Sequence, residues 1–227
     1  MTGTHITPAP ERVGQGTAVE QSRAAAEVLG AIEAARRWPR DVQQARRELA
    51  DSCGLMSVAE SARYEYRRGG ETVTGPTVAL LREIARCWQH IHHGIVELRR
   101  DEEYGQSEVM AYAWDVQGGV RSSRTFILPH RRYQPRKGAS NKRMVDLRDI
   151  QENNVSVGGR NVRECIASVL PPWLLLEAEE LCRKTLTEGE LDAEAKRKPL
   201  RPLPVRIGQA IELFEALGVT ERQLETR

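Results

Sequence analysis

The 227-residue sequence lacks the short motifs that mark the large enzyme classes. It has no G-x-x-x-x-G-K-[ST] phosphate loop, no G-x-G-x-x-G segment after a predicted strand, no H-E-x-x-H and no G-x-S-x-G. Its acidic residues are not clustered in the arrangements that two-metal nucleases use. These absences argue against an ATPase and a metallohydrolase. We expect a binding protein that is not an enzyme and uses no cofactor.

Membrane-spanning and secretory segments are also missing from the sequence. No apolar run approaches the roughly 20 residues that a membrane-spanning helix needs, and the N-terminus has no basic segment followed by an apolar core. We therefore expect no contact with a membrane and a cytoplasmic location. The four cysteines, Cys53, Cys87, Cys165 and Cys182, are scattered and form no C-x-x-C pair. This spacing favours reduced, structural thiols over disulfides.

Positive charge is concentrated in one segment, although the net charge is only +2. The basic residues of this segment are Arg121, Arg124, Arg131, Arg132, Arg136, Lys137, Lys142, Arg143 and Arg148. Asp146 is the only acidic residue among them. A solvated loop would explain such a run, but arginine outnumbers lysine, and polar and aromatic residues such as Tyr133 are interleaved. The pattern therefore favours a binding site for a polyanion.

The hydrophobic pattern predicts an α+β fold in which helices pack against a three-stranded antiparallel meander. Alternating residues predict strands over residues 95–100, 108–116 and 120–128, joined by an acidic turn and a short glycine-bearing hairpin. In the middle strand both faces are apolar, so we expect helices or a neighbouring subunit to cover it on both sides. Tyr112 and Trp114 share one of these faces, where they either pack in the core or stack against nucleobases.

Helical spacing predicts three helices before the meander, over residues 19–38, 41–52 and 56–66, with Asp41 capping the second. A central helix is expected to begin at Pro76. It is expected to end in a histidine run, His90, His92 and His93, whose spacing does not favour a metal site.

The turn before the central helix, Arg67-Arg68-Gly69-Gly70, is either a plain tight turn or a close contact for a phosphate. After the basic segment we expect helices over 147–155, 160–170 and 173–186, with a break at Gly158-Gly159. By composition, residues 1–17 form a disordered arm, 18–187 the core, 188–204 a linker and 205–227 a small helical tail. The tail is too short to bury much surface alone, so it is either incomplete or docked on a partner.

Three segments carry a resemblance to a known family. They are GPTVALLREIARCW, SSRTFILPHRR and GGRNVRECIASVLPPWLLLEAEELCRKTL, and together they cover about residues 56–186. In element order the chain resembles phage-encoded single-strand DNA annealing proteins, the recombinases of the RecT/Redβ and Rad-like group, and IELFEALGVTERQLE resembles their helical appendage. The histidine run and the double proline at 171–172 depart from that pattern.

The resemblance implies a homo-oligomeric ring or filament in the cytoplasm of a bacterial host. Its basic groove would hold single-stranded DNA by the backbone and anneal complementary strands without ATP, in phage-type homologous recombination. By position, the groove residues implied are Arg121, Arg124, Arg131, Arg132, Arg160 and Arg163. The full set of candidate DNA contacts adds Arg136, Lys137, Lys142, Arg143, Arg67 and Arg68, with Tyr112, Trp114 and Tyr133 for base stacking. Magnesium would enter only as a DNA counterion. The implied partners are single-stranded DNA, the annealed duplex, and an exonuclease or single-strand-binding protein held by residues Val205 to Arg227.

Three other functions remain open at this point. A scaffold protein would use the basic segment to dock acidic protein partners. A nucleic-acid enzyme would carry an unrecognised site, for which Asp115 is a candidate acid. A sequence-specific regulator would prefer one duplex over single strands.

Overall fold

The computed structural model describes residues 15–132, 142–191, 196, 200 and 203–219 of the chain. Its N-terminal elements are α1 (Gln15–Arg37), α2 (Val42–Cys53), α3 (Met56–Ser61), β1 (Arg63–Arg68), β2 (Glu71–Pro76) and α4 (Val78–Trp88). The remaining elements are β3 (Ile91–Asp101), β4 (Gln106–Asp115), β5 (Val120–Pro129), β6 (Arg131–Arg132), β7 (Lys142–Arg143), α5 (Leu147–Val169), α6 (Pro172–Glu188) and α7 (Leu203–Ala216).

The central feature is the antiparallel sheet β3-β4-β5, which confirms the predicted α+β fold with a three-stranded meander, N-terminal helices and C-terminal helices. Burial alternates along β4, where Val109, Ala111 and Ala113 are fully buried and the residues between them are half-buried. A β-bulge at Leu98 interrupts the pairing of β3 with β4.

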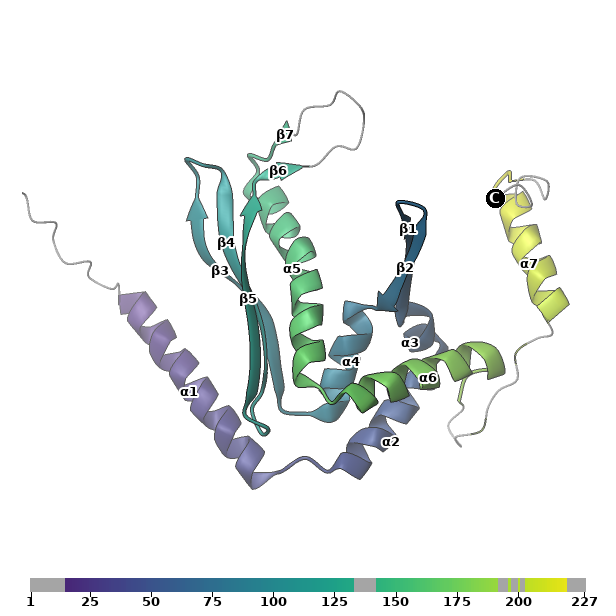
Figure 1. Ribbon diagram of the computed structural model, residues 1–227, viewed down its shortest axis with the longest axis horizontal. Coiled ribbons are helices and arrows are strands. Elements are labelled where there is room, and N and C mark those ends of the chain that lie inside the picture. Colours follow the sequence, from purple (N-terminus) through teal and green to yellow (C-terminus); the bar gives the residue numbers. More distant parts are fainter. Residues whose placement is uncertain (1–14, 133–141, 192–195, 197–199, 201–202, 220–227) are drawn as a thin grey trace, which may run out of the picture.

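A layer of helices covers one face of the sheet, and Figure 1 shows α5 running along it. α4 packs beside α5, and α2, α3 and α6 surround the other sides of α4. The core between these elements contains fully buried aliphatic side chains from several helices: Leu49, Leu80, Leu81, Ile84, Val162, Ile166 and Leu174.

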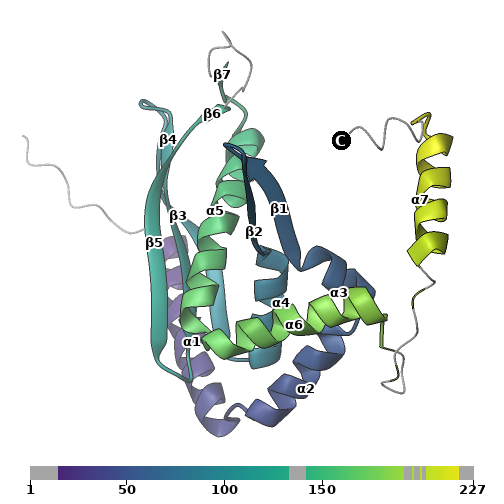
Figure 2. The same cartoon turned by 45° about the vertical axis from the view of Figure 1, so that its right-hand side comes forward.

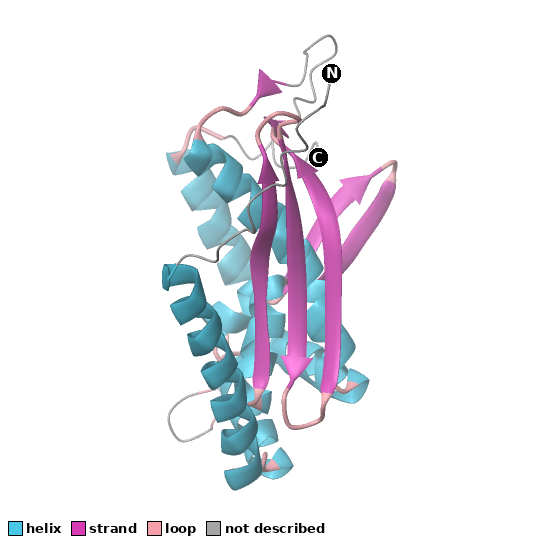
Figure 3. Ribbon diagram, turned by 90° about the vertical axis from the view of Figure 1, so that its left-hand side faces the viewer, coloured by secondary structure: helices cyan, strands magenta, loops and turns pink. Residues whose placement is uncertain are grey.

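On the opposite face of the sheet, the described residues form no such layer (Figure 3). We call it the open sheet face. It carries His92, Val96, Met110, Tyr112, Trp114, Arg121, Thr125 and Ile127, as the strand register shows. Within the described residues of one copy, helices therefore cover β4 on one side only, and cover of the other side by a neighbouring subunit stays a prediction.

A hairpin of β1 and β2 replaces the second half of the third predicted helix. That helix ends at Ser61 and not at residue 66, and Pro76 lies at the end of β2 and not in the first turn of α4. Thr77 caps α4 instead, because its Oγ1 accepts from the Leu80 amide at 3.2 Å. We call this hairpin the arm; it stands beside α5 (Figure 2).

α5 is one continuous helix of 23 residues, so the predicted break at Gly158-Gly159 is wrong. A side chain at Gly158 would meet Ile95 on β3, with 2.7 Å between the added Cβ and Ile95 Cδ1. The glycine therefore permits close packing of α5 on the sheet and does not end the helix.

The histidine run lies at the start of β3 and not at the end of α4. α4 ends at Trp88, and Gln89 and His90 follow with φ angles of 62° and 55°. Non-glycine residues rarely adopt this left-handed conformation, so a surrounding constraint has to hold it. His90 Nε2 lies 2.9 Å from the Trp38 carbonyl oxygen.

The constraint is the buried side chain of Arg40. Its guanidinium donates to the carbonyl oxygens of Trp88 and Gln89 and to Asp115 Oδ1, the last two at 2.9 Å, and it stacks on the Trp88 ring. Asp115 also accepts from the Gly118 amide at 2.9 Å. The Arg40 and Asp115 side chains are only 8% and 7% exposed.

The tail helix α7 lies apart from the rest of the chain in Figures 1 and 2. It ends at Ala216, and Gly218 follows with a φ of 82°, a conformation that glycine adopts readily after a helix. Its apolar side chains are exposed, Ile207 by 50% and Phe214 by 45%. Residues 220–227 of the predicted tail lie outside the described residues, as do residues 1–14 of the N-terminal segment.

We expect Arg40→Ala to lower the free energy of unfolding by about 3–5 kcal/mol, because it leaves the Asp115 carboxylate buried and unpaired. Urea titration followed by tryptophan fluorescence measures this loss. Arg37→Ala is the matched control: Arg37 stacks on Trp38 but is exposed, and its removal should cost less than about 1 kcal/mol. Equal losses for the two variants would contradict the role of Arg40.

Candidate nucleic-acid interface

The arm and α5 bring aromatic and basic side chains together. The Tyr64 ring lies under the Arg163 guanidinium of α5, with 4.9 Å between Cζ and the ring centroid. Tyr66 stacks beside Tyr64 with 5.9 Å between the centroids and 28° between the ring planes. Tyr66 is 49% exposed. Stacked, accessible tyrosines next to a guanidinium can hold the faces of nucleobases.

The local sequence explains this arrangement. β1 has the sequence RYEYRR, so Tyr64 and Tyr66 point to the same face of the hairpin. Gly75 lies opposite Tyr64, and a Cβ at Gly75 would come within 2.7 Å of the tyrosine hydroxyl oxygen. The absence of a side chain at Gly75 therefore makes room for the Tyr64 ring.

Three exposed arginines extend this surface. Arg67 and Arg68 lie at the tip of the arm, which turns through Gly69 and Gly70 with φ angles of 60° and 90°. Arg160 lies one turn of α5 before Arg163. None of the three forms an ion pair with another residue that the structure describes.

Acidic residues also lie near the arm and α5. Glu71 pairs opposite Arg68 in the hairpin, and Glu164 Oε1 lies 2.8 Å from Arg163 Nη2. Glu71 therefore offsets part of the positive charge at the tip of the arm, where Arg67 lies opposite the uncharged Thr72. We define the arm–α5 surface as Tyr64, Tyr66, Arg67, Arg68, Arg160 and Arg163.

The predicted strand arginines lie on opposite faces of the sheet. Arg121 pairs with Trp114 and so belongs to the open sheet face. Arg124 pairs with Ala111 on the helix-covered face, at the β5 edge, where its charge acts on the nearby thiol of Cys165. The structure therefore does not bring Arg121 and Arg124 into one groove.

The two predicted stacking residues of β4 are half-buried on the open sheet face. The Tyr112 ring lies over Gly94, where an added Cβ would be 3.1 Å from its hydroxyl oxygen. The Trp114 ring lies 6.5 Å from the His92 ring, measured between centroids. These rings face away from α5, so Tyr112 and Trp114 are separate from the arm–α5 surface.

The rest of the predicted basic set lies at the far end of the sheet. Arg131 pairs with Arg143, and Arg132 pairs with Lys142, in the short ladder of β6 and β7. Arg143 Nη2 donates to the Glu102 carbonyl oxygen at 2.7 Å. The other predicted contacts of this segment, Tyr133, Arg136 and Lys137, lie outside the described residues.

A cavity of about 440 Å³ lies beside this ladder, where α5 begins, and Arg100, His130 and Arg143 line it. Arg100 is held by Glu97, with 2.7 Å between Nε and Oε1. His130 is buried, and its Nε2 lies 2.7 Å from Ser107 Oγ. Burial lowers the pKa of His130, and the charge of Arg100 acts in the same direction.

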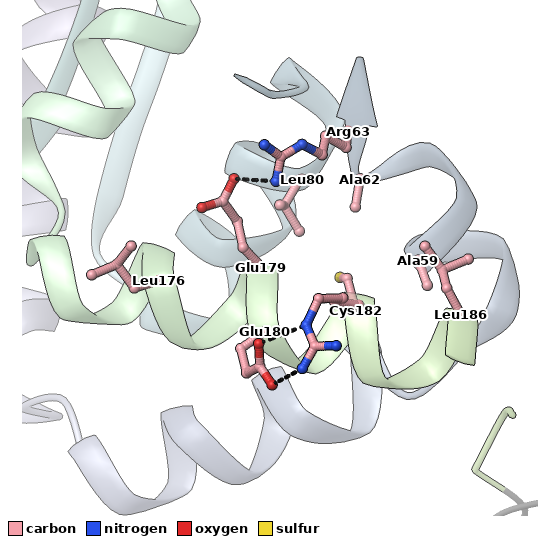
Figure 4. A pocket seen from close by; sticks show the side chains of 10 residues that line it. Ala59, Ala62, Arg63, Leu80, Leu176, Glu179, Glu180, Cys182 and Leu186 are labelled. Carbon is pink, nitrogen blue, oxygen red and sulfur yellow. Dashed lines mark hydrogen bonds and ion pairs between the residues drawn. The ribbon is translucent and has the colours of Figure 1, made fainter. Parts of the chain in front are cut away.

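A second cavity, of about 300 Å³, lies between α3, α4 and α6 (Figure 4). Its inner wall is apolar and includes the buried side chains of Ala59, Ala62 and Leu80. The charged side chains at its rim are paired: Arg63 lies 3.9 Å from Glu179, and Arg183 lies 2.5 Å from Glu180. These pairs leave no excess positive charge for an anion.

Metal ligands are not assembled in the part of the chain that the structure describes, where no three His, Cys, Asp or Glu residues could hold an ion. The histidine run is divided between two faces, because His92 lies on the open sheet face and His93 points toward the helices. Burial lowers the pKa of His93, as does the charge of Arg82.

No family model, curated protein or solved structure matches this chain. Among the residues described, no helix combines the length and the apolar character needed to cross a membrane.

Tyr64 and Tyr66 were not identified from the sequence as site residues. The signal was present as two tyrosines separated by one residue and followed by Arg67 and Arg68, which is an alternating strand pattern. In the predicted helix, residues two apart lie on different faces, so the helix prediction hides the shared face of the two rings.

Gly75→Ala tests how the tyrosines are positioned. The new Cβ should displace the Tyr64 ring and weaken its contact with Arg163, without removing any charged or aromatic group. The NMR shift of the Arg163 Nε proton reports the nearby ring and should move toward its free value. Gly159→Ala is the control, because an added Cβ there meets nothing within 4 Å. An unchanged shift in Gly75→Ala would show that the contact does not depend on this glycine.

The buried histidines predict a pH dependence of stability. A histidine pKa lowered in the folded state means that the unfolded chain binds the proton more tightly. Stability is therefore present above the unfolded pKa of about 6.5 and is lost as the pH falls toward the lower folded pKa. The slope between pH 7.5 and 5.5 should be at most about 1.4 kcal/mol per pH unit for one proton. Urea titrations of His130→Gln should give a flatter slope than those of the unmodified chain, and the same slope would refute the assignment.

Proposed function

We propose that this protein binds single-stranded DNA without sequence preference and promotes annealing of complementary strands without ATP. The observation that carries the proposal is the pair of stacked tyrosines on the arm, held against Arg163 and bordered by Arg67 and Arg68. Aromatic side chains that stack on bases, beside arginines that neutralise phosphates, are the two components of non-specific single-strand binding. The resemblance to phage annealing proteins supports the same function.

Phosphate contacts supply most of the affinity in this mechanism. Arg67, Arg68 and Arg160 neutralise backbone phosphates and release counterions, which favours binding at low salt. Tyr66 stacks on a base face and leaves the hydrogen-bonding edge of the base free for a second strand. Several copies on one strand would keep it extended and concentrate it for pairing.

The proposed function also implies self-assembly and protein partners. Annealing on an extended strand requires a homo-oligomer, as a ring or filament. The exposed apolar side chains of α7 suit it to recruit an exonuclease or a single-strand-binding protein. The site of action would be the cytoplasm of a bacterial host, during phage-type recombination.

Binding of a labelled single-stranded oligonucleotide across a salt series tests the proposal. The Arg67→Ala/Arg68→Ala variant should bind more weakly and lower the log–log salt slope by about 1.4, since each phosphate contributes about 0.7. Tyr66→Ala should lose about 1–3 kcal/mol, roughly 5- to 150-fold in affinity, and keep the slope. Arg47→Ala, an exposed arginine on α2, is the control and should change neither quantity.

Each alternative predicts a different result. If Arg121→Ala lowers the salt slope and Arg67→Ala/Arg68→Ala does not, the DNA lies on the open sheet face and the arm–α5 surface is the wrong site. Binding without faster annealing, after a complementary strand is added, would refute annealing and indicate storage of single strands. No binding at low salt would favour the scaffold that docks acidic proteins.

A further inference from the structure

α1 carries an apolar stripe that packs on no other element among the residues that the structure describes. Ala25, Val28, Leu29 and Ile32 recur at helical spacing, and Val28 and Leu29 are 43% and 68% exposed. The opposite side of the helix is polar and carries the ion pair of Arg23 and Glu27. Amphipathic helices owe most of their stability to packing of the apolar side, so α1 requires a surface to cover this stripe.

The open sheet face also exposes apolar side chains that no other described element covers. When an antiparallel sheet exposes one face to water, that face is normally polar. Here it carries Val96 and Ile127, which are 41% and 53% exposed, with Met110, Tyr112 and Trp114 between them. All three strands contribute apolar side chains to this face, and Ile127 of β5 lies opposite Glu108 of β4.

α1 does not cover the sheet of its own chain, because contacts at its C-terminal end, which we call its base, direct the helix away from the open sheet face. Ala35 is buried, the Trp38 carbonyl oxygen lies 2.9 Å from His90 Nε2, and the Arg40 amide donates to Gln117 Oε1 at 2.8 Å. From this base the helix rises beside the β3 edge of the sheet (Figure 3). In the described chain it shares no extensive contact with any strand.

We propose that the stripe of α1 packs on the open sheet face of a second copy of this chain. The dimensions agree: a helix of 23 residues is about 35 Å long, and strands of ten or eleven residues are about 33–36 Å long. The two surfaces differ, so every copy uses its helix on one neighbour and its sheet on the other. Such a head-to-tail contact builds a ring if the rotation closes and a filament if it does not.

This interface leaves the arm–α5 surface accessible, because that surface lies on the other side of the sheet. The inference extends the proposed function, which requires several copies on one DNA strand. It rests on the proposed function only for the role of the assembly in annealing. Self-association is measured without DNA, so its failure can be distinguished from a failure of DNA binding.

Two single substitutions test the interface by sedimentation velocity of the full chain. Leu29→Glu alters the helix stripe and Val96→Glu alters the sheet face. Both positions are exposed in a single copy, so neither change should lower the thermal unfolding temperature. The unmodified chain should sediment as an assembly, and each variant alone as a monomer of about 25.6 kDa. Arg23→Gln changes the net charge by the same one unit on the opposite side of α1 and should assemble normally.

Mixing the two variants distinguishes head-to-tail contact from any symmetric one. The Leu29→Glu chain retains an unaltered open sheet face, and the Val96→Glu chain retains an unaltered α1 stripe. An equimolar mixture should therefore form one interface and stop at a dimer, with twice the mass of the chain. A monomeric unmodified chain, variants that assemble normally, or a mixture that stays monomeric would each overturn the inference.

Discussion

The Arg40 guanidinium joins three segments that are distant in sequence: the connection after α1, the end of α4 and the β4–β5 hairpin. The last carbonyl oxygens of a helix have no partner within it, and Arg40 supplies partners for two of them while pairing with Asp115. With these groups joined, Gln89 and His90 can hold their left-handed conformation and start β3 in the correct register. The same side chain fixes the base of α1, so it sets the direction of that helix.

The alternation of side chains along β4 separates the functions of the two faces. Ala111 and Ala113 are small and fully buried, which lets α5 approach the sheet closely, whereas Tyr112 and Trp114 point to the other side. Arg121 and Arg124 are only three residues apart, but the pleat sends them to opposite faces. The proposed DNA surface on the arm and α5 and the proposed contact on the open sheet face therefore lie on opposite sides of the sheet and do not compete.

The sequence predicted the meander, α4 and the Asp41 cap because each follows from a local pattern that tertiary contacts do not override. The sequence does not predict the arm, because Val58, Ala62 and Tyr66 fit helical spacing, and the pairing of β1 with β2 is what makes the segment a strand. The predicted helix break at Gly158 is wrong because this glycine makes room for Ile95, which is more than 60 residues away in the sequence. The candidate contacts named from the sequence include Arg67, Arg68, Arg160 and Arg163 of the arm–α5 surface, but local patterns do not show which basic residues share a surface.

The four cysteines have a consequence for chemistry at the surface. All four are buried, and burial raises the pKa of Cys165 and raises that of Cys87 to about 11. A hydrogen bond with Cys182, together with burial, raises the pKa of Cys53. Since the thiolate is the reactive form, Cys53, Cys87 and Cys165 should react slowly with alkylating reagents and oxidants while the chain is folded. The hydrogen bond with Cys53 lowers the pKa of Cys182, so burial alone protects that thiol. A single cysteine introduced on the arm would then be the preferred target of a maleimide dye, and the native thiols could stay in place.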